Sequence, residues 1–390
     1  MPRCVDHRQR EPRTLRTGWG VVLLLFLSVV GCASGRQGPL PRADRRDAIA
    51  FLPLQNLTGE LAPMREIGET LQRQMTARGV RLLEDSQLRQ VMERHRMRYT
   101  GGLSKEMGRA FFQEANVAAV MLTSLDEYDE IYPPRISLTA RLVSTGENPR
   151  ILWMESVTLA GDEQPGILGM KLVTDPRVLL ARATAALADA VARKGTPSQY
   201  AGPARRRFPP RSVYRASQST IQAGTAQRVA VLSFANQSTR KEAGELVALQ
   251  LLRQLSRTTT LSVVEPGLVR EALLETRTIQ QGGLSLAQID LLRAFLDVDL
   301  VLIGTVIEYQ DASGTPGGPV VAFSVQAVDT EARQVVWSSR SRRFGDENVV
   351  FFDAGRVHTA QGLSSGLAGA VIERMLAQAK SKAPTVAKAR

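Results

Sequence analysis

The feature that most constrains this chain is an internal repeat with an offset of 180 to 184 residues. Residues 49–56 (IAFLPLQN) match residues 229–236 (VAVLSFAN), and the tetrapeptide GGLS occurs at 101–104 and again at 282–285. Matches that stay in order while the offset drifts slowly are typical of a duplicated unit, and a duplicated unit decides the architecture of the whole chain. The sequence therefore predicts one domain present twice.

Each copy has the hydrophobic pattern of an α/β unit. A continuous apolar run opens it, as in a strand buried on both faces, and an amphipathic helix follows, with Ile67, Leu71 and Met75 on one face in the first copy. The expected order continues with a strand (80–84 and 261–265), two helices around the Gly-Gly turn, a strand (117–125 and 298–307), a hairpin (135–143 with 150–159, and 319–328 with 333–342) and a last helix (174–193 and 361–379).

Strands joined through helices lie parallel, whereas hairpin strands lie antiparallel. The predicted fold class is therefore α/β, with two tandem copies of a mixed, partly parallel sheet flanked by helices in the order β-α-β-α-α-β-β-β-α.

Several residues predict local structure at matched positions of the two copies. Serine favours the N-cap of a helix, and glycine pairs supply positive φ in turns. Asparagine caps turns, and tryptophan in a hairpin strand is expected in the core. The residues are Ser104 and Ser285, Gly101-Gly102 and Gly282-Gly283, Asn56 and Asn236, and Trp153 and Trp337.

The amino terminus has the form of an export signal. Five arginines precede an apolar run that begins at Val21 and is too short for a membrane-spanning helix. The run ends in Val29, Val30, Gly31 and Cys32, which resembles the bacterial lipobox. That resemblance implies cleavage before Cys32, which would carry diacylglyceryl and palmitate chains and bind membrane lipid through them. Ala33, in place of an aspartate, implies the periplasmic face of the outer membrane.

The expected domains follow from these signals: a lipoprotein signal peptide (1–31), a lipidated tether (32–46), a first α/β domain (47–195), an Arg/Pro-rich linker (196–228), a second α/β domain (229–380) and a basic tail (381–390).

The positive charge lies outside the expected domains. The net charge is +12, yet residues 196–228 hold six arginines and no acid, and four further basic residues follow from Lys380. The linker arginines are expected to be solvated. The alternative is contact with anionic lipid or cell-wall polymer. Its candidate residues are Arg205, Arg206, Arg207, Arg211 and Arg215. A nucleic-acid partner is not expected for an exported lipoprotein.

The chain shows no convincing catalytic set, so we expect that it is not an enzyme and has no catalytic residue, cofactor or metal site. The motif G-x-S-x-G around Ser364 lacks the strand that a nucleophile elbow requires. The acids Asp126, Glu127, Asp129 and Glu130 lack the glycine-bearing loop of a calcium site and are expected to be solvated at a strand end. The glycine pairs lack the companions of a phosphate loop.

The repeated pattern carries a family resemblance. An apolar strand ending in Asn56 or Asn236, an amphipathic helix, a VVE strand, the Gly-Gly turn and the strand Gly304–Tyr309 resemble the anticodon-binding-domain-like superfamily of envelope proteins. That group includes the soluble domain of the curli secretion channel, the amino-terminal domain of TolB and LpoB-type lipoproteins. The first copy departs from the pattern at Ser124-Leu125-Asp126.

The resemblance implies a non-enzymatic scaffold or adaptor that binds an unidentified envelope protein. One alternative is a subunit of a channel-like secretion or envelope assembly, which would be a homo-oligomer, but no membrane hairpin is evident in the sequence. Another is an LpoB-like activator of a peptidoglycan synthase. The tether 33–46 reaches at most about 50 Å, which disfavours this second alternative.

Overall fold

The first copy of the repeat forms a mixed sheet. Its strands are β1 (Ile49–Phe51), β2 (Gln55–Asn56), β3 (Ala119–Asp129), β4 (Arg135–Ser144) and β5 (Ile151–Ala160). The order is β1-β3-β4-β5, and β2 also pairs with β3. The short strands β1 and β2 run parallel to β3, whereas β3, β4 and β5 form an antiparallel meander. The computed structural model describes residues 48–163, 172–193, 208–217, 221, 226–258, 261–276, 283–311, 318–347, 349 and 355–380.

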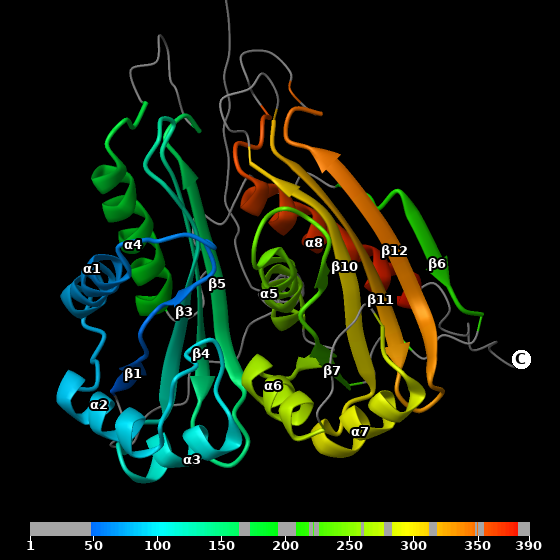
Figure 1. Ribbon diagram of the computed structural model, residues 1–390, viewed down its shortest axis with the longest axis horizontal. Coiled ribbons are helices and arrows are strands. Elements are labelled where there is room, and N and C mark those ends of the chain that lie inside the picture. The colour runs from blue at the N-terminus through cyan, green and yellow to red at the C-terminus, as the bar shows by residue number, and fades with distance from the viewer. Residues whose placement is uncertain are drawn as a thin grey trace, which may run out of the picture. The chain divides into compact units, whose positions relative to one another are not determined.

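The second copy forms a second mixed sheet with the same core topology (Figure 1). Its strands are β6 (Ser212–Arg215), β7 (Gln227–Val231), β8 (Ala235–Asn236), β9 (Leu261–Val263), β10 (Leu300–Gln310), β11 (Val320–Asp329) and β12 (Gln334–Phe344). The order is β6-β12-β11-β10-β7-β9, and β8 pairs with β10. The predicted fold class, two tandem mixed sheets flanked by helices, is confirmed.

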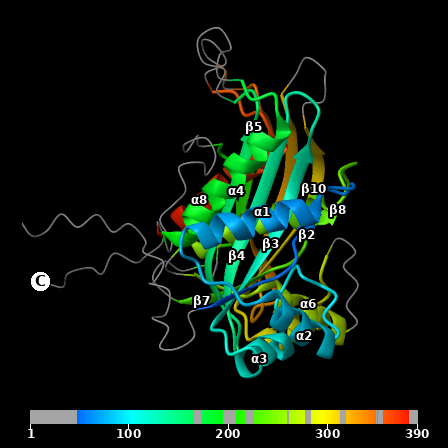
Figure 2. The ribbon, with the colours of Figure 1, turned by 90° about the vertical axis from the view of Figure 1, so that its left-hand side faces the viewer.

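Each sheet has its helices where the hydrophobic pattern predicts them. The first copy contains α1 (Met64–Ala77), α2 (Asp85–Arg94), α3 (Lys105–Gln113) and α4 (Pro176–Ala192), and the second contains α5 (Ala243–Ser256), α6 (Pro266–Glu275), α7 (Leu286–Leu296) and α8 (Ala360–Lys380). Helices α1 and α4 lie across one face of the first sheet (Figure 2), where Ile67 and Leu187 pack with Trp153. Within the described ranges, no helix combines the length and the apolar character that crossing a membrane requires.

Two details of the element order differ from the prediction. The strand expected at 80–84 is reduced to a single bridge between Leu82 and Ile49, whereas its counterpart forms β9. The repeat offset rises from 180 to 181 between the first helix and this strand. The second copy therefore has one more residue here, which allows the chain to form a strand beside β7. The second difference is β6, which lies inside the predicted linker and pairs with β12.

Apolar side chains explain why part of this arginine-rich segment is ordered. Phe208 and Ile221 are each almost fully buried in the core of the second copy, and Val213 packs against the same core. Phe208 lies against α8, where a Cβ on Gly366 would come within 2.9 Å of its ring. Burial of these apolar groups offsets the loss of chain entropy in the segment.

The capping predictions are confirmed. The hydroxyl of Ser104 accepts a hydrogen bond from the backbone N–H of Met107, and Ser285 forms a reciprocal capping box with Gln288. Asn56 and Asn236 bind their turns in the same way: each carboxamide oxygen accepts from the backbone and side chain two residues on, and each amide donates to the carbonyl four residues on. Trp153 and Trp337 lie in the cores as predicted.

The reason predicted for the glycine pairs is wrong for Gly101, Gly102 and Gly283, because none of these three has positive φ. Gly282 lies outside the described residues. Glycine is required at 102 because the two copies touch there: a Cβ on Gly102 would lie 2.6 Å from the Cα of Gly267. In the second copy, a Cβ on Gly283 would meet nothing within 4 Å. The repeated motif thus has a steric role in one copy only.

This difference predicts the effect of two matched substitutions. Gly102→Ala forces the backbones of the two copies apart, and we expect a loss of about 1–3 kcal/mol in the free energy of unfolding, measured by urea titration. Gly283→Ala at the matched position should leave stability unchanged or slightly raised. Equal effects of the two substitutions would contradict the steric role.

Candidate functional site

The candidate site is the interface between the two copies, which both belong to the compact unit Gln37–Arg390. Its centre is an ion pair between Arg141 on β4 and Glu265, the residue that precedes α6. The guanidinium Nε and Nη2 each lie 3.2 Å from a different carboxylate oxygen. Both side chains are buried, with exposures of 4% and 0%. Burial alone would lower the pKa of Arg141, but the Glu265 carboxylate raises it above its ordinary value.

The carboxylate of Glu265 accepts hydrogen bonds from backbone N–H groups of both copies. The donors are the backbone N–H of Gly267, in the first turn of α6, and the backbone N–H of Leu103 in the first copy. Arg141 in turn donates to the carbonyl oxygen of Gly101. One carboxylate therefore caps α6 and fixes the Gly101–Leu103 segment against it, because a helix N-terminus favours a negative charge.

A second buried pair joins β5 to α5. The carboxylate of Glu155 accepts from Arg253 at 2.7 Å and from Arg257 at 2.7 and 2.8 Å. Burial, together with the neighbouring Arg257, lowers the pKa of Arg253 to about 10. Arg253 also donates to the hydroxyl of Ser365 on α8. These contacts bind the face of the first sheet to both long helices of the second copy (Figure 1).

The acids at the end of β3 are not solvated, which corrects the prediction for Asp126 and Glu127. Their exposures are 1% and 7%, because the second copy covers this end of the strand. The Asp126 carboxylate accepts from Ser124, Thr139 and Gln361. Asp129 and Glu130 stay accessible, as predicted, although Asp129 pairs with Arg135.

Three carboxylates, Asp126, Glu127 and Asp311, form what we call the interface acid cluster. Burial raises the pKa of Asp126 to about 6, and it also raises the pKa values of Glu127 and Asp311. Arg135 lies 3.0 Å from Glu127, and Arg240 donates to the carbonyl of Asp126. The three upward shifts have one main cause: a dry interface disfavours the charge of a carboxylate.

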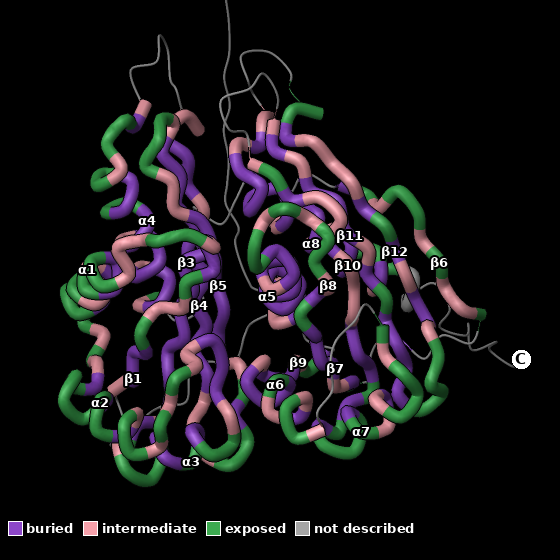
Figure 3. The backbone as a smooth tube through the Cα atoms, in the orientation of Figure 1, coloured by how far each residue is buried: buried purple, intermediate pink, exposed green. Residues whose placement is uncertain are grey.

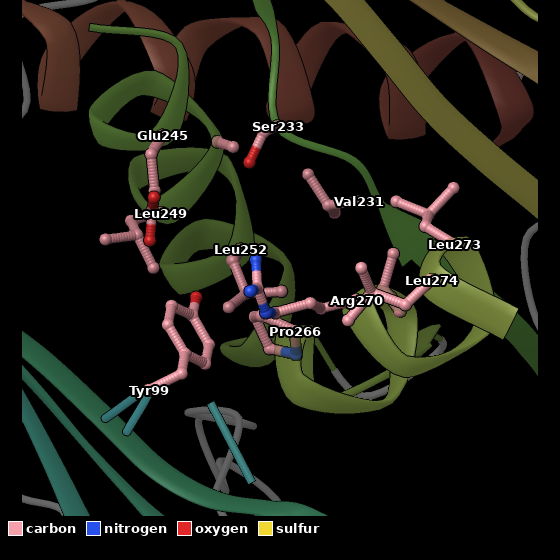
Figure 4. Close-up of a pocket in the computed structure, with 12 residues that line it drawn as sticks. Tyr99, Val231, Ser233, Glu245, Leu249, Leu252, Pro266, Arg270, Leu273 and Leu274 are labelled. Carbon is pink, nitrogen blue, oxygen red and sulfur yellow. The ribbon is translucent and has the colours of Figure 1, made fainter. Parts of the chain in front are cut away.

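A cleft of about 300 Å³ lies between α5 and α6 (Figure 4). Apolar side chains form most of its wall, and Tyr99 of the first copy closes one side. The Arg270 guanidinium lies 4.3 Å from the centre of the Tyr99 ring, and Glu245 accepts a hydrogen bond from Gln55. The full lining is Tyr99, Val231, Ser233, Glu245, Ala248, Leu249, Leu252, Pro266, Val269, Arg270, Leu273 and Leu274.

Burial shifts the pKa values of two groups of the cleft in the direction that favours their neutral forms. It raises the pKa of Tyr99 to about 12 and also raises the pKa of Glu245. Arg270 is exposed at the mouth. Such a cleft, apolar with a cation at its rim, can bind an apolar group that carries a negative charge beside it.

The predicted site residues are only partly within the described chain. Cys32, the peptidase residues Val29, Val30 and Gly31, and the linker residues Arg205, Arg206 and Arg207 lie outside it. The side chain of Arg211 lies 3.7 Å from Glu347, and Arg215 donates to the carbonyl of Ile221. Ser364 lies inside α8, fully buried, which is the helical setting the sequence favoured over a nucleophile elbow.

The described residues include no group of three or more metal-ligating side chains that could hold an ion. Sequence reasoning missed the interface itself, although one signal was present. Glu84 and Glu265 occupy matched positions before a helix, and Arg141 places a charge in the middle of a predicted strand of the first copy. A charged residue within such a strand indicates a buried partner.

The buried pair predicts a strong effect of single substitutions. Arg141→Met leaves Glu265 buried and unpaired, and we expect a loss of about 3–5 kcal/mol in the free energy of unfolding. Adding Glu265→Leu should recover part of that loss, because the unpaired charge is then removed. The exposed pair Arg109–Glu147 is the control, and Arg109→Met should leave the urea midpoint unchanged. Additive effects at 141 and 265 would contradict the pairing.

The interface acid cluster predicts a pH dependence. Asp126 keeps its proton in the folded state where the unfolded chain has lost it, so its contribution to stability falls as the pH rises from about 4 to about 6. The shift corresponds to roughly 3 kcal/mol. Asp126→Asn should therefore gain stability relative to the wild type across this range, measured by urea titration at several pH values. The exposed Asp85→Asn is the control, and a constant difference at Asp126 would contradict the assignment.

Comparison with known proteins gives fold-level neighbours only. No protein-family model matches the chain, and no curated protein matches it. Similar solved structures include the PelC dodecamer from Paraburkholderia phytofirmans, with 20% identity over 42% of this chain and 96% of that chain and a TM-score of 0.29. The lipoprotein GNA1162 from Neisseria meningitidis has 17% identity over 40% and 99% of the two chains and a TM-score of 0.27. The C-terminal domain of LpoB from Salmonella enterica has 15% identity over 31% and 87%, with a TM-score of 0.25. At TM-scores of 0.29 and below, these likenesses assign neither a family nor a function.

Proposed function

We propose that the protein is a non-enzymatic scaffold or adaptor of the bacterial envelope. Acyl chains on Cys32 hold it at the periplasmic face of the outer membrane, and the two joined copies bind another envelope protein. The lipobox-like end of the signal, Val29 to Cys32, supports the anchor. Several acyl chains would make the attachment effectively permanent, since each buried CH2 contributes about 0.8 kcal/mol.

One observation carries the adaptor role: the interface uses its buried charged residues to hold the copies together. Arg141 and Glu265 bind each other, and Glu155 binds two arginines. These buried ion pairs within the described residues hold the two copies in a fixed arrangement. A rigid pair of domains with an accessible cleft suits recognition, because a preformed surface loses little entropy on binding.

The cleft between α5 and α6 is the recognition site in this proposal. Leu274 is 63% exposed at its edge, whereas Leu249 and Leu252 are buried in its wall. Arg270 offers a positive charge beside this apolar surface. The chemistry fits a partner segment that presents an apolar side chain next to a carboxylate, since a central apolar pocket with a charged rim is typical of binding hot spots.

Affinity capture from intact cells after crosslinking, followed by mass spectrometry, tests the anchor and the cleft separately. The wild type should recover an envelope partner, and Cys32→Ala should lose it because the protein leaves the membrane. Leu274→Glu, which places a charge at the edge of the cleft, should lose the partner while the lipid anchor is intact. Leu61→Glu is the matched control, since Leu61 is fully exposed and lies away from the cleft.

Other outcomes would overturn parts of this proposal. Recovery of the same partner with Leu274→Glu would exclude the cleft as the recognition site. Recovery of a peptidoglycan synthase whose rate the protein raises would favour the synthase activator. Turnover in a hydrolase panel that Ser364→Ala abolishes would exclude a non-enzymatic role.

A further inference from the structure

The two copies meet through different surfaces. The first copy contributes the face of its sheet opposite α1 and α4, and the second contributes its helices α5 and α8. One row of that sheet face is Ser124, Thr139 and Ser156, which are direct neighbours across β3, β4 and β5. All three are buried, and Gln250 of α5 donates to the Ser156 hydroxyl at 3.5 Å. A contact between unlike surfaces can repeat from one unit to the next.

The second sheet has the matched row, but no described residue covers it. Thr305, Ser324 and Arg340 are direct neighbours across β10, β11 and β12. They correspond in register to Ser124, Thr139 and Ser156. Thr305 and Ser324 are half-buried and Arg340 is exposed, whereas the corresponding residues of the first copy are buried. Figure 3 shows the same contrast between β3–β5 and β10–β12.

The next row of the second sheet is also accessible. Ile303 and Ser338 are half-buried and Gln326, between them, is exposed. Among their counterparts, Arg141 binds Glu265 and Met154 packs in the core of the second copy. Leu122 packs within the first copy, as Ile303 does within the second. The second sheet therefore presents, without a cover among the described residues, the surface that the first sheet uses as an interface.

The helix layer of the first copy is the complementary free surface. Helix α1 corresponds to α5, yet its outer residues Arg65, Glu69 and Arg73 are exposed, whereas nearly all of α5 is buried (Figure 3). A cleft of about 380 Å³ lies between α1 and α2 and corresponds to the cleft between α5 and α6. Its wall contains Phe51 and Leu88, which match Val231 and Val269 of the other cleft.

We propose that a second copy of this chain docks on the open face of the second sheet, through the α1 helix layer of its own first copy. The contact repeats between molecules the interface that already joins the two copies within one chain. Because the surfaces are unlike, the assembly is head-to-tail and forms a ring or a filament. This inference goes beyond the proposed function, since it concerns self-association and not the adaptor's partner.

The polarity of the open face agrees with this assignment. The row Ser124, Thr139 and Ser156 consists of hydroxyl side chains, and it is nevertheless buried, with Gln250 of α5 donating to Ser156. Both free surfaces also carry charges of both signs: the Arg65–Glu69 pair on α1, and Arg340 with the Glu308–Arg342 pair on the sheet. Opposite charges can therefore meet at the rim of the contact, where they set orientation.

Site-directed crosslinking of the full chain in detergent-solubilised membranes tests the proposal. The processed chain has no cysteine other than Cys32, so introduced thiols are the reactive ones. Thr70→Cys and Arg340→Cys are combined in one chain, because Thr70 and Arg340 match the contacting residues Gln250 and Ser156. A short bis-maleimide should link this variant into a ladder of dimers, trimers and larger species. Each single substitution should give no crosslink.

The control is the internal pair Gln250→Cys with Ser156→Cys, which should link within one chain. Failure of the double variant to form a ladder while this control reacts would overturn the proposal. Dimers formed by either single variant would also overturn it, because they indicate a symmetric contact. Independently, Ser324→Glu should lower the mass in light scattering toward that of one chain, whereas the exposed Arg109→Glu should not.

Discussion

The pairing of Arg141 with Glu265 is the contact on which the arrangement of the two copies depends. Both groups are removed from water, and the same carboxylate caps α6 and binds the backbone of Leu103. Replacing a buried ion pair with apolar groups is often neutral, so the pair does not owe its importance to net stabilisation. Its effect is to disfavour other alignments of the two copies. Any other alignment of the two copies would leave Arg141 or Glu265 buried without its partner, at a cost of about 3–5 kcal/mol. The pair therefore selects one register, and the glycine contact between Gly102 and Gly267 completes it by allowing the backbones to meet.

Duplication explains how such an interface can arise from two similar domains. The matched residue of Glu265 is Glu84, which also precedes a helix but is exposed and makes no side-chain cap. The matched residue of Gly102 is Gly283, which has open space around it. The two copies thus keep the same local motifs, and each motif has an interface role in one copy only. This asymmetry follows from geometry, because a head-to-tail contact uses different surfaces of its two members.

The sequence predicted the fold well and the interface poorly, for physical reasons. Element order and helix caps depend on local pattern, so Ser104, Ser285 and the hairpins could be predicted from neighbouring residues. Burial of Asp126 and Glu127 depends on a distant part of the chain: Gln361 lies 235 residues after Asp126, and Asp311 also belongs to the second copy. A hydropathy pattern predicts that such acids are exposed to solvent, because it contains no information about a surface so far along the chain. For the same reason the cleft closed by Tyr99 could not be predicted, since its wall combines two copies of the repeat.

The polar composition of the sheet face allows one repeat to serve at two kinds of position. A serine or threonine hydroxyl exchanges water for a protein partner at small net cost, so the row at Ser124, Thr139 and Ser156 can be buried. The matched row at Thr305, Ser324 and Arg340 stays accessible in the same chain. An apolar face would not permit both states, because an uncovered apolar patch of this extent promotes aggregation. When another surface covers a face of hydroxyls, by contrast, its stabilisation depends on hydrogen bonds to specific partners such as Gln250. The specificity of the contact therefore comes from its polar groups, among them the buried Arg141–Glu265 pair.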